Sequence, residues 1–334
     1  MADKIIVGLD IGYSNLKFVF NDPENPKSVV TELLPVGAAP VSQVMQGVAG
    51  DKGSSLIQVD IDGEKWYSAI DPSMIQGLCR VIHENYPSSN QYKALFLGAL
   101  ARIGAPVIDR LVTGLPVNQY LDKQYTQNLK DQLTGVHKLN SKVSVEVKEV
   151  LVVPQPIGAY MDTTQNVKDD GLLELIANGQ TLVLDPGFFS VDWVTIVGGS
   201  LATESCGTSF DGVSVILEKT ASYLSAEYAG TVNFSKLEKS VVEGKRQIAL
   251  SGAMRDFTEF LEKAIQDHAP RSVNAMQNDL RKNTFTPDVI ILAGGGAKFF
   301  KETTERTFKN ARIVVLDRPE VSNANGFWLL GAAT

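Results

Sequence analysis

Two short segments of the chain carry the same arrangement of residues, one that suits phosphate and cation chemistry. One apolar run ends in Asp10-x-Gly12, and another ends in Asp185-x-Gly187. Such a turn points successive backbone N–H groups into one concavity, which suits phosphate oxygens. The glycine lets the backbone approach an anion, and the aspartate can hold a cation or its water. Asp-x-Gly is also common turn chemistry after any strand. The pairing predicts two turns that grip one triphosphate and Mg²⁺ from both sides.

A run of three glycines is the next candidate for ligand contact. Gly294–Gly296 follow the apolar run Val289–Leu292 and precede a helical pattern that includes Lys298. Glycines at this place leave the amino end of a helix open to a flat ligand or a phosphate. Close packing of a helix on a sheet also selects glycine, so the run has two explanations. It is neither a Walker motif nor Gly-x-Gly-x-x-Gly, which argues against a Rossmann dinucleotide site.

Gln155 is the candidate for orienting a water molecule. It stands between Pro154 and Pro156, directly after an apolar run and near the middle of the chain. The prolines restrict the backbone on either side. A glutamine is not a strong base, but its amide can orient an attacking water toward a γ-phosphate. The alternative is a proline-rich hinge with an inert, exposed glutamine.

These residues need strands and helices to position them, and the hydrophobic pattern predicts an alternation of the two. Apolar runs predict strands over 5–10, 16–20, 56–61, 110–113, 143–147, 150–153, 181–185, 191–197, 200–204, 289–292 and 312–316. Helical spacing predicts helices over 91–102, 121–133, 213–228, 253–267, 271–281, 298–309 and 325–333. The first two runs read as a β-hairpin around the first turn. The whole pattern favours an α/β architecture.

Composition limits the classes of protein that fit. A chain of 334 residues suggests two domains, and no apolar run is long enough to cross a membrane. The 31 basic and 38 acidic residues give a net charge of -7, which argues against direct binding of nucleic acid by a broad basic face. Two cysteines, Cys79 and Cys206, are too few for a disulfide framework, and this fits a reducing cytoplasm. We therefore expect a cytoplasmic protein without membrane contact.

Taken in order, these motifs resemble those of the actin/Hsp70/sugar-kinase superfamily. Within it the sequence is most similar to bacterial plasmid-segregation actins of the ParM/StbA type. Their first turn reads Asp-x-Gly-x-Ser/Thr-Asn-x-Lys, which the segment 10–17 matches at each position. Segment 206–213 looks like the family's small-residue turn, and segment 323–331 is similar to its closing Asn-Gly-aromatic stretch.

The resemblance implies a fold of duplicated actin-like (ribonuclease H-like) domains that face each other across a nucleotide cleft. Domain I would comprise residues 1–160 and 317–334, and domain II residues 161–316. ATP or GTP with Mg²⁺ would be the cofactors. Asp10 and Asp185 would hold the metal, and Gln155 would position the hydrolytic water. The nucleotide would contact Asp10, Gly12, Tyr13, Ser14, Asn15, Lys17, Asp185, Gly187, Phe188, Gly207, Gly294, Gly295, Gly296 and Lys298.

The second turn departs from the family pattern. Small residues usually follow Asp-x-Gly there, whereas Phe188 and Phe189 follow it here. Ser190 stands where the family has threonine, and Asp192 keeps the second acidic position. A phenylalanine at the turn either blocks close approach of the backbone to the phosphates or turns its ring into the core and leaves its N–H on the ligand.

The function implied by the resemblance is that of an actin-like ATPase. It would polymerise with bound nucleotide, segregate plasmid DNA, and reach that DNA through a DNA-binding adaptor at a centromere-like site. A small-molecule kinase of the same superfamily is the alternative, although it would need an aspartate or glutamate as base toward an acceptor hydroxyl, and Gln155 stands at that position instead. A chaperone ATPase domain and an inactive scaffold, the latter suggested by Phe188 and Phe189, are further alternatives.

Overall fold

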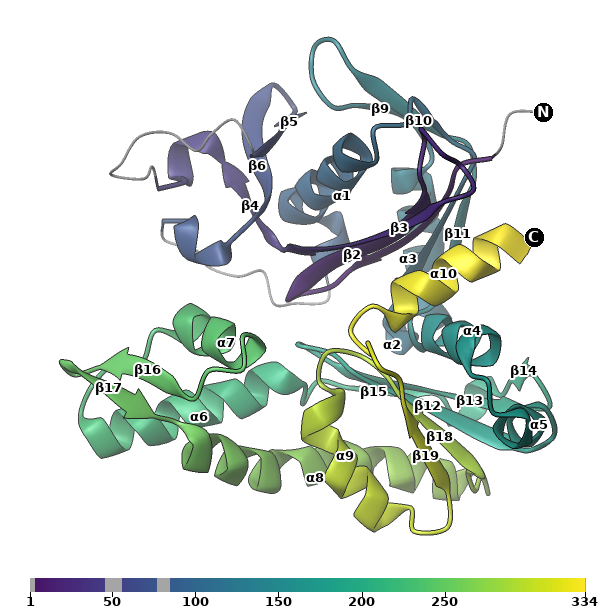
Figure 1. The fold of residues 1–334 in the computed structure, drawn as a ribbon, viewed down its shortest axis with the longest axis vertical. Coiled ribbons are helices and arrows are strands. Elements are labelled where there is room, and N and C mark those ends of the chain that lie inside the picture. Colours follow the sequence, from purple (N-terminus) through teal and green to yellow (C-terminus); the bar gives the residue numbers. More distant parts are fainter. Residues whose placement is uncertain (1–3, 46–55, 77–84, 334) are drawn as a thin grey trace. The chain divides into compact units, whose positions relative to one another are not determined.

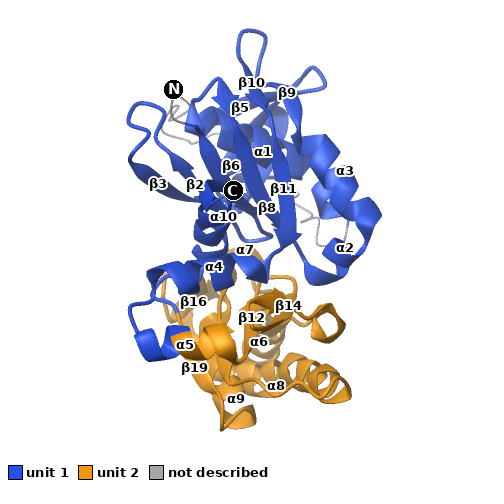
Figure 2. Cartoon of the chain, turned by 90° about the vertical axis from the view of Figure 1, so that its right-hand side faces the viewer, with its two compact units in different colours: residues 1–173, 316–334 blue, residues 174–315 orange. Residues whose placement is uncertain are grey.

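The computed structural model describes residues 4–45, 56–76 and 85–333, so Cys79 lies outside the described residues. The chain divides into two compact units (Figure 2). Unit 1 comprises residues 1–173 and 316–334, and unit 2 comprises residues 174–315. We expected the first boundary at residue 160, which falls inside helix α4 (Pro156–Asn166). Helix α4 packs along α10 (Ser322–Ala333), and this contact keeps the whole of α4 within unit 1.

Unit 1 is built on a five-stranded sheet with the order β11-β8-β1-β2-β3. Its strands are β1 (Ile6–Ile11), β2 (Asn15–Asn21), β3 (Val29–Pro35), β8 (Arg110–Leu115) and β11 (Val150–Pro154). The predicted hairpin is present, because β1 and β2 pair antiparallel. Strands β8 and β11 run parallel to β1, so all three carboxyl ends meet at one edge of the sheet.

The two faces of this sheet are covered by different helices (Figure 1). Helix α1 (Asn90–Ile103) packs on one face, where Leu9, Leu16 and Leu111 enter the main apolar core. Helix α10 covers the other face so closely that a Cβ atom on Gly8 would overlap the α10 backbone. Since alternate residues of β1 point to opposite faces, Leu9 faces α1 while Asp10 lies on the α10 side.

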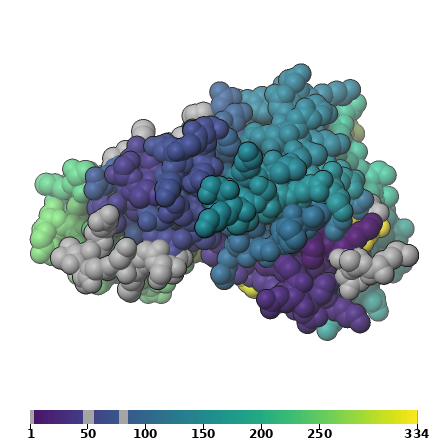
Figure 3. Space-filling model, turned by 90° about the horizontal axis from the view of Figure 1, so that it is seen from above, coloured from purple at the N-terminus to yellow at the C-terminus, as the bar shows by residue number. Residues whose placement is uncertain are grey.

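The atoms of unit 1 are coloured purple to teal in Figure 3. Smaller elements complete this unit. They form two three-stranded sheets, with the orders β4-β6-β5 and β7-β10-β9, and further helices. The bounds are β4 (Gly37–Pro40), β5 (Ile57–Ile61), β6 (Glu64–Ile70), β7 (Val107–Ile108), β9 (Gly135–Lys138), β10 (Ser144–Val147), α2 (Val117–Leu121) and α3 (Lys123–Leu133). Short 3₁₀ helices lie at Val41–Gln43, Pro72–Met74 and Tyr86–Ser88.

Unit 2 is built on a second sheet, with the order β14-β13-β12-β18-β19, in which β15 also pairs with β13. The strands are β12 (Gln180–Pro186), β13 (Val191–Val197), β14 (Ser200–Leu201), β15 (Gly207–Ser209), β18 (Val289–Leu292) and β19 (Arg312–Val315). Strands β12 and β13 form an antiparallel hairpin, and β18 runs parallel to β12. A hairpin with an adjacent parallel strand thus occurs in both units. Helix α5 (Asp170–Asn178) spans the division between them.

The helices of unit 2 differ from the prediction in one region. They are α6 (Val213–Tyr228), α7 (Phe234–Val242), α8 (Thr258–Lys282) and α9 (Ala297–Thr307). The helix expected over 253–267 is wrong at its start, where β17 (Ala253–Asp256) pairs with β16 (Gln247–Leu250). The two helices expected on either side of Pro270 are one continuous helix, α8. A proline inside a helix costs about 3 kcal/mol. Burial of Ala264, Val273 and Met276 along α8 offsets this cost.

No helix of the described ranges is long and apolar enough to cross a membrane.

Candidate functional site

Asp10 is the charged centre of the candidate site in unit 1. It stands near the end of β1 with 4% of its surface exposed. Lys17 lies directly opposite Asp10 in the β1–β2 hairpin, so the two side chains share one face of the sheet. The Lys17 Nζ atom is 2.8 Å from Asp10 Oδ2. This ion pair compensates the charge of a carboxylate that would otherwise be costly to bury.

Gln155 reaches the same carboxylate from the other side of β8. It follows the end of β11, and its Nε2 atom donates a hydrogen bond of 2.9 Å to Asp10 Oδ1. Gly114 of β8 makes room for it, since a Cβ atom on Gly114 would lie 2.9 Å from Gln155 Cα. The structure therefore brings together Asp10, Lys17 and Gln155, which are far apart in sequence. The role of Gly114 carried no sequence signal.

The turn between β1 and β2 is closed on itself. The Gly12 N–H donates to the Asn15 carbonyl at 3.1 Å. A Cβ atom on Gly12 would lie 3.2 Å from Lys17 Nζ. The lack of a side chain at Gly12 therefore leaves room for the ammonium group beside the turn. Ser14 and Asn15 are half-buried in the same turn. Tyr13 stacks its ring on Tyr86, with centroids 4.6 Å apart.

The Tyr92 hydroxyl lies in a buried environment near this turn. Burial raises the pKa of Tyr92 far above its usual value, and the negative charge of Asp10 raises it further. Both effects disfavour the phenolate, because a second negative charge in a low-dielectric interior is costly. Tyr92 therefore stays a neutral phenol at physiological pH.

In unit 2, Asp185 stands near the end of β12 and is also buried. It lies opposite Asp192 in the β12–β13 hairpin. The Gly187 N–H donates to the Ser190 carbonyl at 2.8 Å and closes the turn. Asp192 accepts two short hydrogen bonds of 2.6 Å, from Ser190 Oγ and from Thr208 Oγ1. Because Ser190 belongs to the turn and Thr208 to β15, Asp192 links the turn to β15. The sequence did not indicate this contact of Thr208.

The two phenylalanines of this turn pack against other aromatic rings of unit 2. Phe188 is 9% exposed and meets Phe234 edge-on, while Phe189 packs on Phe210. Of the two expectations for Phe188, the ring turned into the core is the one observed. The carbonyls of Gly187 and Phe188 accept hydrogen bonds of 3.1 and 2.8 Å from the first N–H groups of α6. Helix α6 therefore holds the turn by its backbone.

The three glycines after β18 have different surroundings. Gly294 has a φ of +70°, and a Cβ atom on it would overlap Asp185 Oδ1. A Cβ atom on Gly296 would lie 2.6 Å from the Pro186 carbonyl, to which the Gly296 N–H donates. Packing against the Asp185 turn therefore accounts for both glycines. Gly295 is exposed, and a Cβ atom there would meet no atom within 4 Å.

Two further predicted contacts have structural surroundings of their own. Gly207 lies under the Trp193 ring, which a Cβ atom would overlap. Lys298 is exposed on α9, and its Nζ atom lies 3.5 Å from the Val241 carbonyl. Packing under Trp193 explains the glycine at position 207 without a ligand.

The groups present fit a nucleotide with a divalent cation. Each unit supplies a buried carboxylate beside a closed glycine turn, and unit 1 adds the Lys17 ammonium group for phosphate oxygens. Gly295 offers open backbone for a flat ring. No group of three or more His, Cys, Asp or Glu side chains among the described residues is placed to hold a metal by itself. Mg²⁺ is usually bound through only one or two carboxylates and keeps several of its waters, so the buried carboxylate beside the turn of each unit suits it.

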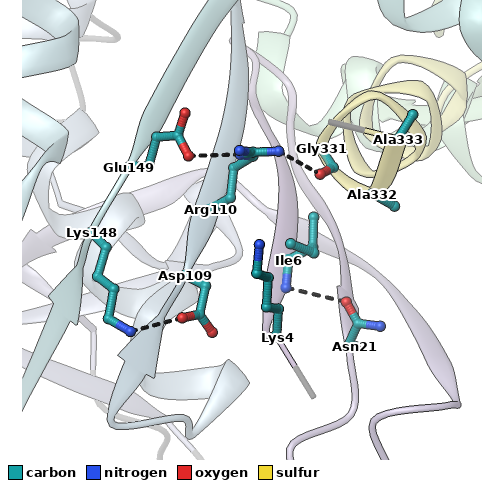
Figure 4. A pocket seen from close by; sticks show the side chains of 10 residues that line it. All are labelled: Lys4, Ile6, Asn21, Asp109, Arg110, Lys148, Glu149, Gly331, Ala332 and Ala333. Atoms are coloured by element: carbon teal, nitrogen blue, oxygen red, sulfur yellow. Dashed lines mark hydrogen bonds and ion pairs between the residues drawn. The ribbon is translucent and has the colours of Figure 1, made fainter. Parts of the chain in front are cut away.

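A separate cavity of about 540 Å³ lies at the opposite end of the strands of unit 1 (Figure 4). Ion pairs cross its lining, Arg110 with Glu149 and Lys148 with Asp109, each at 2.8 Å. Arg110 also donates a hydrogen bond of 3.1 Å to the Gly331 carbonyl near the end of α10. The lining charges are thus largely paired with one another, and Arg110 fastens α10 to the sheet.

Two family models match the chain. Residues 8–158 match the N-terminal domain of actin-like proteins, and residues 183–306 match the C-terminal domain of the archaeal MreB-like actin homologue. No curated protein matched the chain in sequence.

Solved structures match over nearly the whole chain. An archaeal actin homologue, Ta0583, is 17% identical with a TM-score of 0.76, over 99% of this chain and 100% of its own. Its complex with ADP is 16% identical with a TM-score of 0.71, over the same shares of the two chains. The subunit of a 15-stranded ParM filament from Clostridium botulinum is 20% identical with a TM-score of 0.73, over 99% and 100%. With a segment in each of its halves matched in this way, the chain has the actin-like fold, which it shares with ParM and the archaeal actin homologues.

Proposed function

We propose that this chain is an actin-like ATPase that forms filaments when it binds a nucleoside triphosphate. The observation that carries the proposal is the buried Asp10 carboxylate, held at one oxygen by Lys17 and at the other by Gln155. Phosphoryl transfer to water requires neutralisation of phosphate charge and an oriented water, which ammonium, carboxylate and amide groups of this kind supply.

Gln155 has the orientation of a residue that positions water. A carboxylate only accepts hydrogen bonds, so the contact with Asp10 uses the Gln155 amide NH₂ group. The Oε1 atom therefore points away from Asp10 and can accept a hydrogen bond from a water molecule. That bond would aim the water's lone pair at the γ-phosphate.

Lys17 and the turns would stabilise the phosphates. The Lys17 ammonium group lies beside Gly12 and would offset negative charge on the β- and γ-oxygens. In unit 2, the turn that begins at Gly187 would supply backbone N–H groups, and Gly295 would lie against the adenosine. Bound Mg²⁺, held by Asp10 and Asp185, would supply further neutralisation of phosphate charge. We propose that both units act on one nucleotide.

The proposed biological role is plasmid segregation, with polymerisation into filaments and a DNA-binding adaptor as partner. The similarity to a ParM filament subunit supports the filament, and the net charge of -7 supports an indirect link to DNA. Nucleotide hydrolysis would weaken contacts between subunits and so time filament disassembly.

Light scattering with ATP, GTP and the two diphosphates tests the filament. Scattering should rise with a triphosphate and stay low with a diphosphate. A flat signal with every nucleotide at high protein concentration would contradict filament formation. ADP formation that requires an added acceptor alcohol, without release of free phosphate, would indicate the kinase alternative instead.

Gln155→Ala tests the assignment of the water-positioning residue. The variant should lose about a hundredfold in hydrolysis rate, the usual cost of a misplaced reacting group, while it keeps nucleotide affinity. Gln247→Ala is the matched control, because Gln247 is exposed on β16. Unchanged hydrolysis in Gln155→Ala would remove Gln155 from the mechanism.

A further inference from the structure

Three tyrosines of unit 1 pack in a row beside the turn between β1 and β2. Tyr13 stacks on Tyr86 with ring centroids 4.6 Å apart and planes inclined by 27°. Tyr86 meets Tyr92 edge-on at 5.5 Å and 87°. Tyr86 and Tyr92 are 5% and 3% exposed. Aromatic pairs in these two geometries attract one another beyond the burial of their area. Tyr13, which belongs to the turn itself, is thereby anchored to the core.

The Tyr86 hydroxyl also contacts the backbone of the turn. It donates a hydrogen bond of 3.4 Å to the Gly12 carbonyl, while the Gly12 N–H donates to Asn15. Both backbone groups of Gly12 are therefore engaged. Glycine has the greatest backbone freedom of all residues, so a contact that fixes it removes the largest source of movement in the turn.

The segment that carries Tyr86 is itself fixed by two helices. Ser89 Oγ donates to the Tyr86 carbonyl at 2.7 Å and caps α1 by accepting from the Tyr92 N–H. From α3, Gln132 Nε2 donates to the Pro87 carbonyl at 3.0 Å. The hydroxyl of Tyr125, also on α3, donates a hydrogen bond of 2.8 Å to Asn85 Oδ1. Tyr86 is thus a rigid support rather than a mobile side chain.

We propose that Tyr86 is a positioning residue that sets the backbone of the Gly12–Asn15 turn before nucleotide arrives. This inference rests on the proposed function, because the turn is the expected phosphate cradle. Donors that are already in place when a ligand binds cost less ordering entropy. Tyr86 acts through Gly12 and Tyr13 and does not itself touch the nucleotide.

Two variants separate the hydroxyl from the rings. Tyr86→Phe removes the contact with Gly12 and keeps the stack, whereas Tyr13→Ala removes the stack and keeps the Tyr86 hydroxyl. Tyr223→Phe is the matched control, because its hydroxyl bonds Asp267 on the exposed surface of unit 2.

Hydrogen exchange of the nucleotide-free protein gives the first measurement. Amides of the peptide over residues 10–16 should exchange faster in Tyr86→Phe and in Tyr13→Ala than in wild type. Exchange in the strands of unit 2 should stay unchanged. Equal exchange of the 10–16 peptide in wild type and both variants overturns the inference.

Titration with fluorescent ATP and ADP analogues gives the second measurement. Loss of one hydrogen bond should weaken affinity about fivefold in Tyr86→Phe. A purely structural role would lower the melting temperature and leave the affinity unchanged, and that outcome also overturns the inference. If wild type binds neither analogue, the proposed function fails, while the exchange measurement still decides whether Tyr86 holds the turn.

Discussion

Asp10 is the residue at which the separate parts of the unit 1 site meet. Its two oxygens are shared between an ammonium group from its own hairpin and an amide from a distant strand end. Because one carboxylate orients both Lys17 and Gln155, a change at Asp10 would disturb charge and water positioning together. In unit 2, Asp192 likewise orients two groups, because it accepts hydrogen bonds from two hydroxyls.

His268 should make the stability of the protein sensitive to acid. It lies on α8 with 4% of its surface exposed, and its Nδ1 atom has no hydrogen-bond partner among the described residues. Burial lowers the pKa of His268, with Arg271 and Lys219 lowering it further and Asp267 and Asp211 opposing. The unfolded state, with a pKa of about 6.5, binds the proton more readily than the fold. The contribution of neutral His268 to the free energy of unfolding is therefore fully present above about pH 6.5. It is lost progressively as the pH drops below that value.

His268→Leu should show a smaller fall in melting temperature between pH 7.5 and 5.5 than wild type. Some of the fall will persist, because burial also lowers the pKa of His137. If the melting temperatures of wild type and His268→Leu fall equally with pH, His268 is not a source of the acid sensitivity.

At the scale of elements, the crossing of α4 and α10 depends on glycine. A Cβ atom on Gly326 would overlap the Gly158 backbone, and one on Gly158 would lie 2.6 Å from Asn323 Cα. Neither helix can move away freely, since the Asn323 side chain accepts a hydrogen bond from the Ala159 N–H. The two backbones are therefore in direct contact.

Gly326→Ala should lower the free energy of unfolding by about 3 kcal/mol, the upper end of the cost of overpacking a core. Gly171→Ala is the matched control, because Gly171 is exposed in α5 and a Cβ atom there makes only an ordinary contact of 3.5 Å. The control should gain up to about 1 kcal/mol, since alanine favours helix over glycine. Urea unfolding measures the free energy of unfolding of both variants. Equal midpoints for Gly326→Ala and Gly171→Ala would show that the crossing of α4 and α10 does not require glycine at position 326.

How far the sequence predicted these elements depended on whether the signal was local. The first hairpin and the two strands of the second followed from apolar runs interrupted by Asp-x-Gly turns, and the structure confirms them. The two-helix prediction around Pro270 failed because packing along α8 outweighs the local cost of proline. The contact of Gln155 with Asp10 depends on the strand order β11-β8-β1, which hydrophobic periodicity does not encode. The packing of Gly294 and Gly296 likewise appears only in three dimensions.

At the scale of the whole molecule, the acidic balance governs contact with nucleic acid. With 38 acidic and 31 basic residues, the chain as a whole repels phosphate. Binding of duplex DNA requires clustered cations that release counterions. Several of the cations described here are already committed to carboxylates, as in the pairs of Arg110 and Lys148.

The protein alone should therefore leave the fluorescence anisotropy of a labelled DNA duplex unchanged at about 0.15 M salt, the physiological ionic strength. A lysine-rich protein of known DNA affinity serves as the positive control. A saturable rise in anisotropy that weakens with added salt would show direct DNA binding and remove the need for an adaptor.

Unit 1 is discontinuous in sequence, and this has a consequence for synthesis on the ribosome. Its core includes Phe327 of α10, which is fully buried against Val112 and Val153. Those two residues emerge early, but α10 is translated only after the whole of unit 2. The nascent chain must carry an open apolar face on β8 and β11 through that interval, while unit 2 is contiguous and can fold at once. Chaperones that bind exposed apolar surface should therefore meet this protein first at its amino-terminal half.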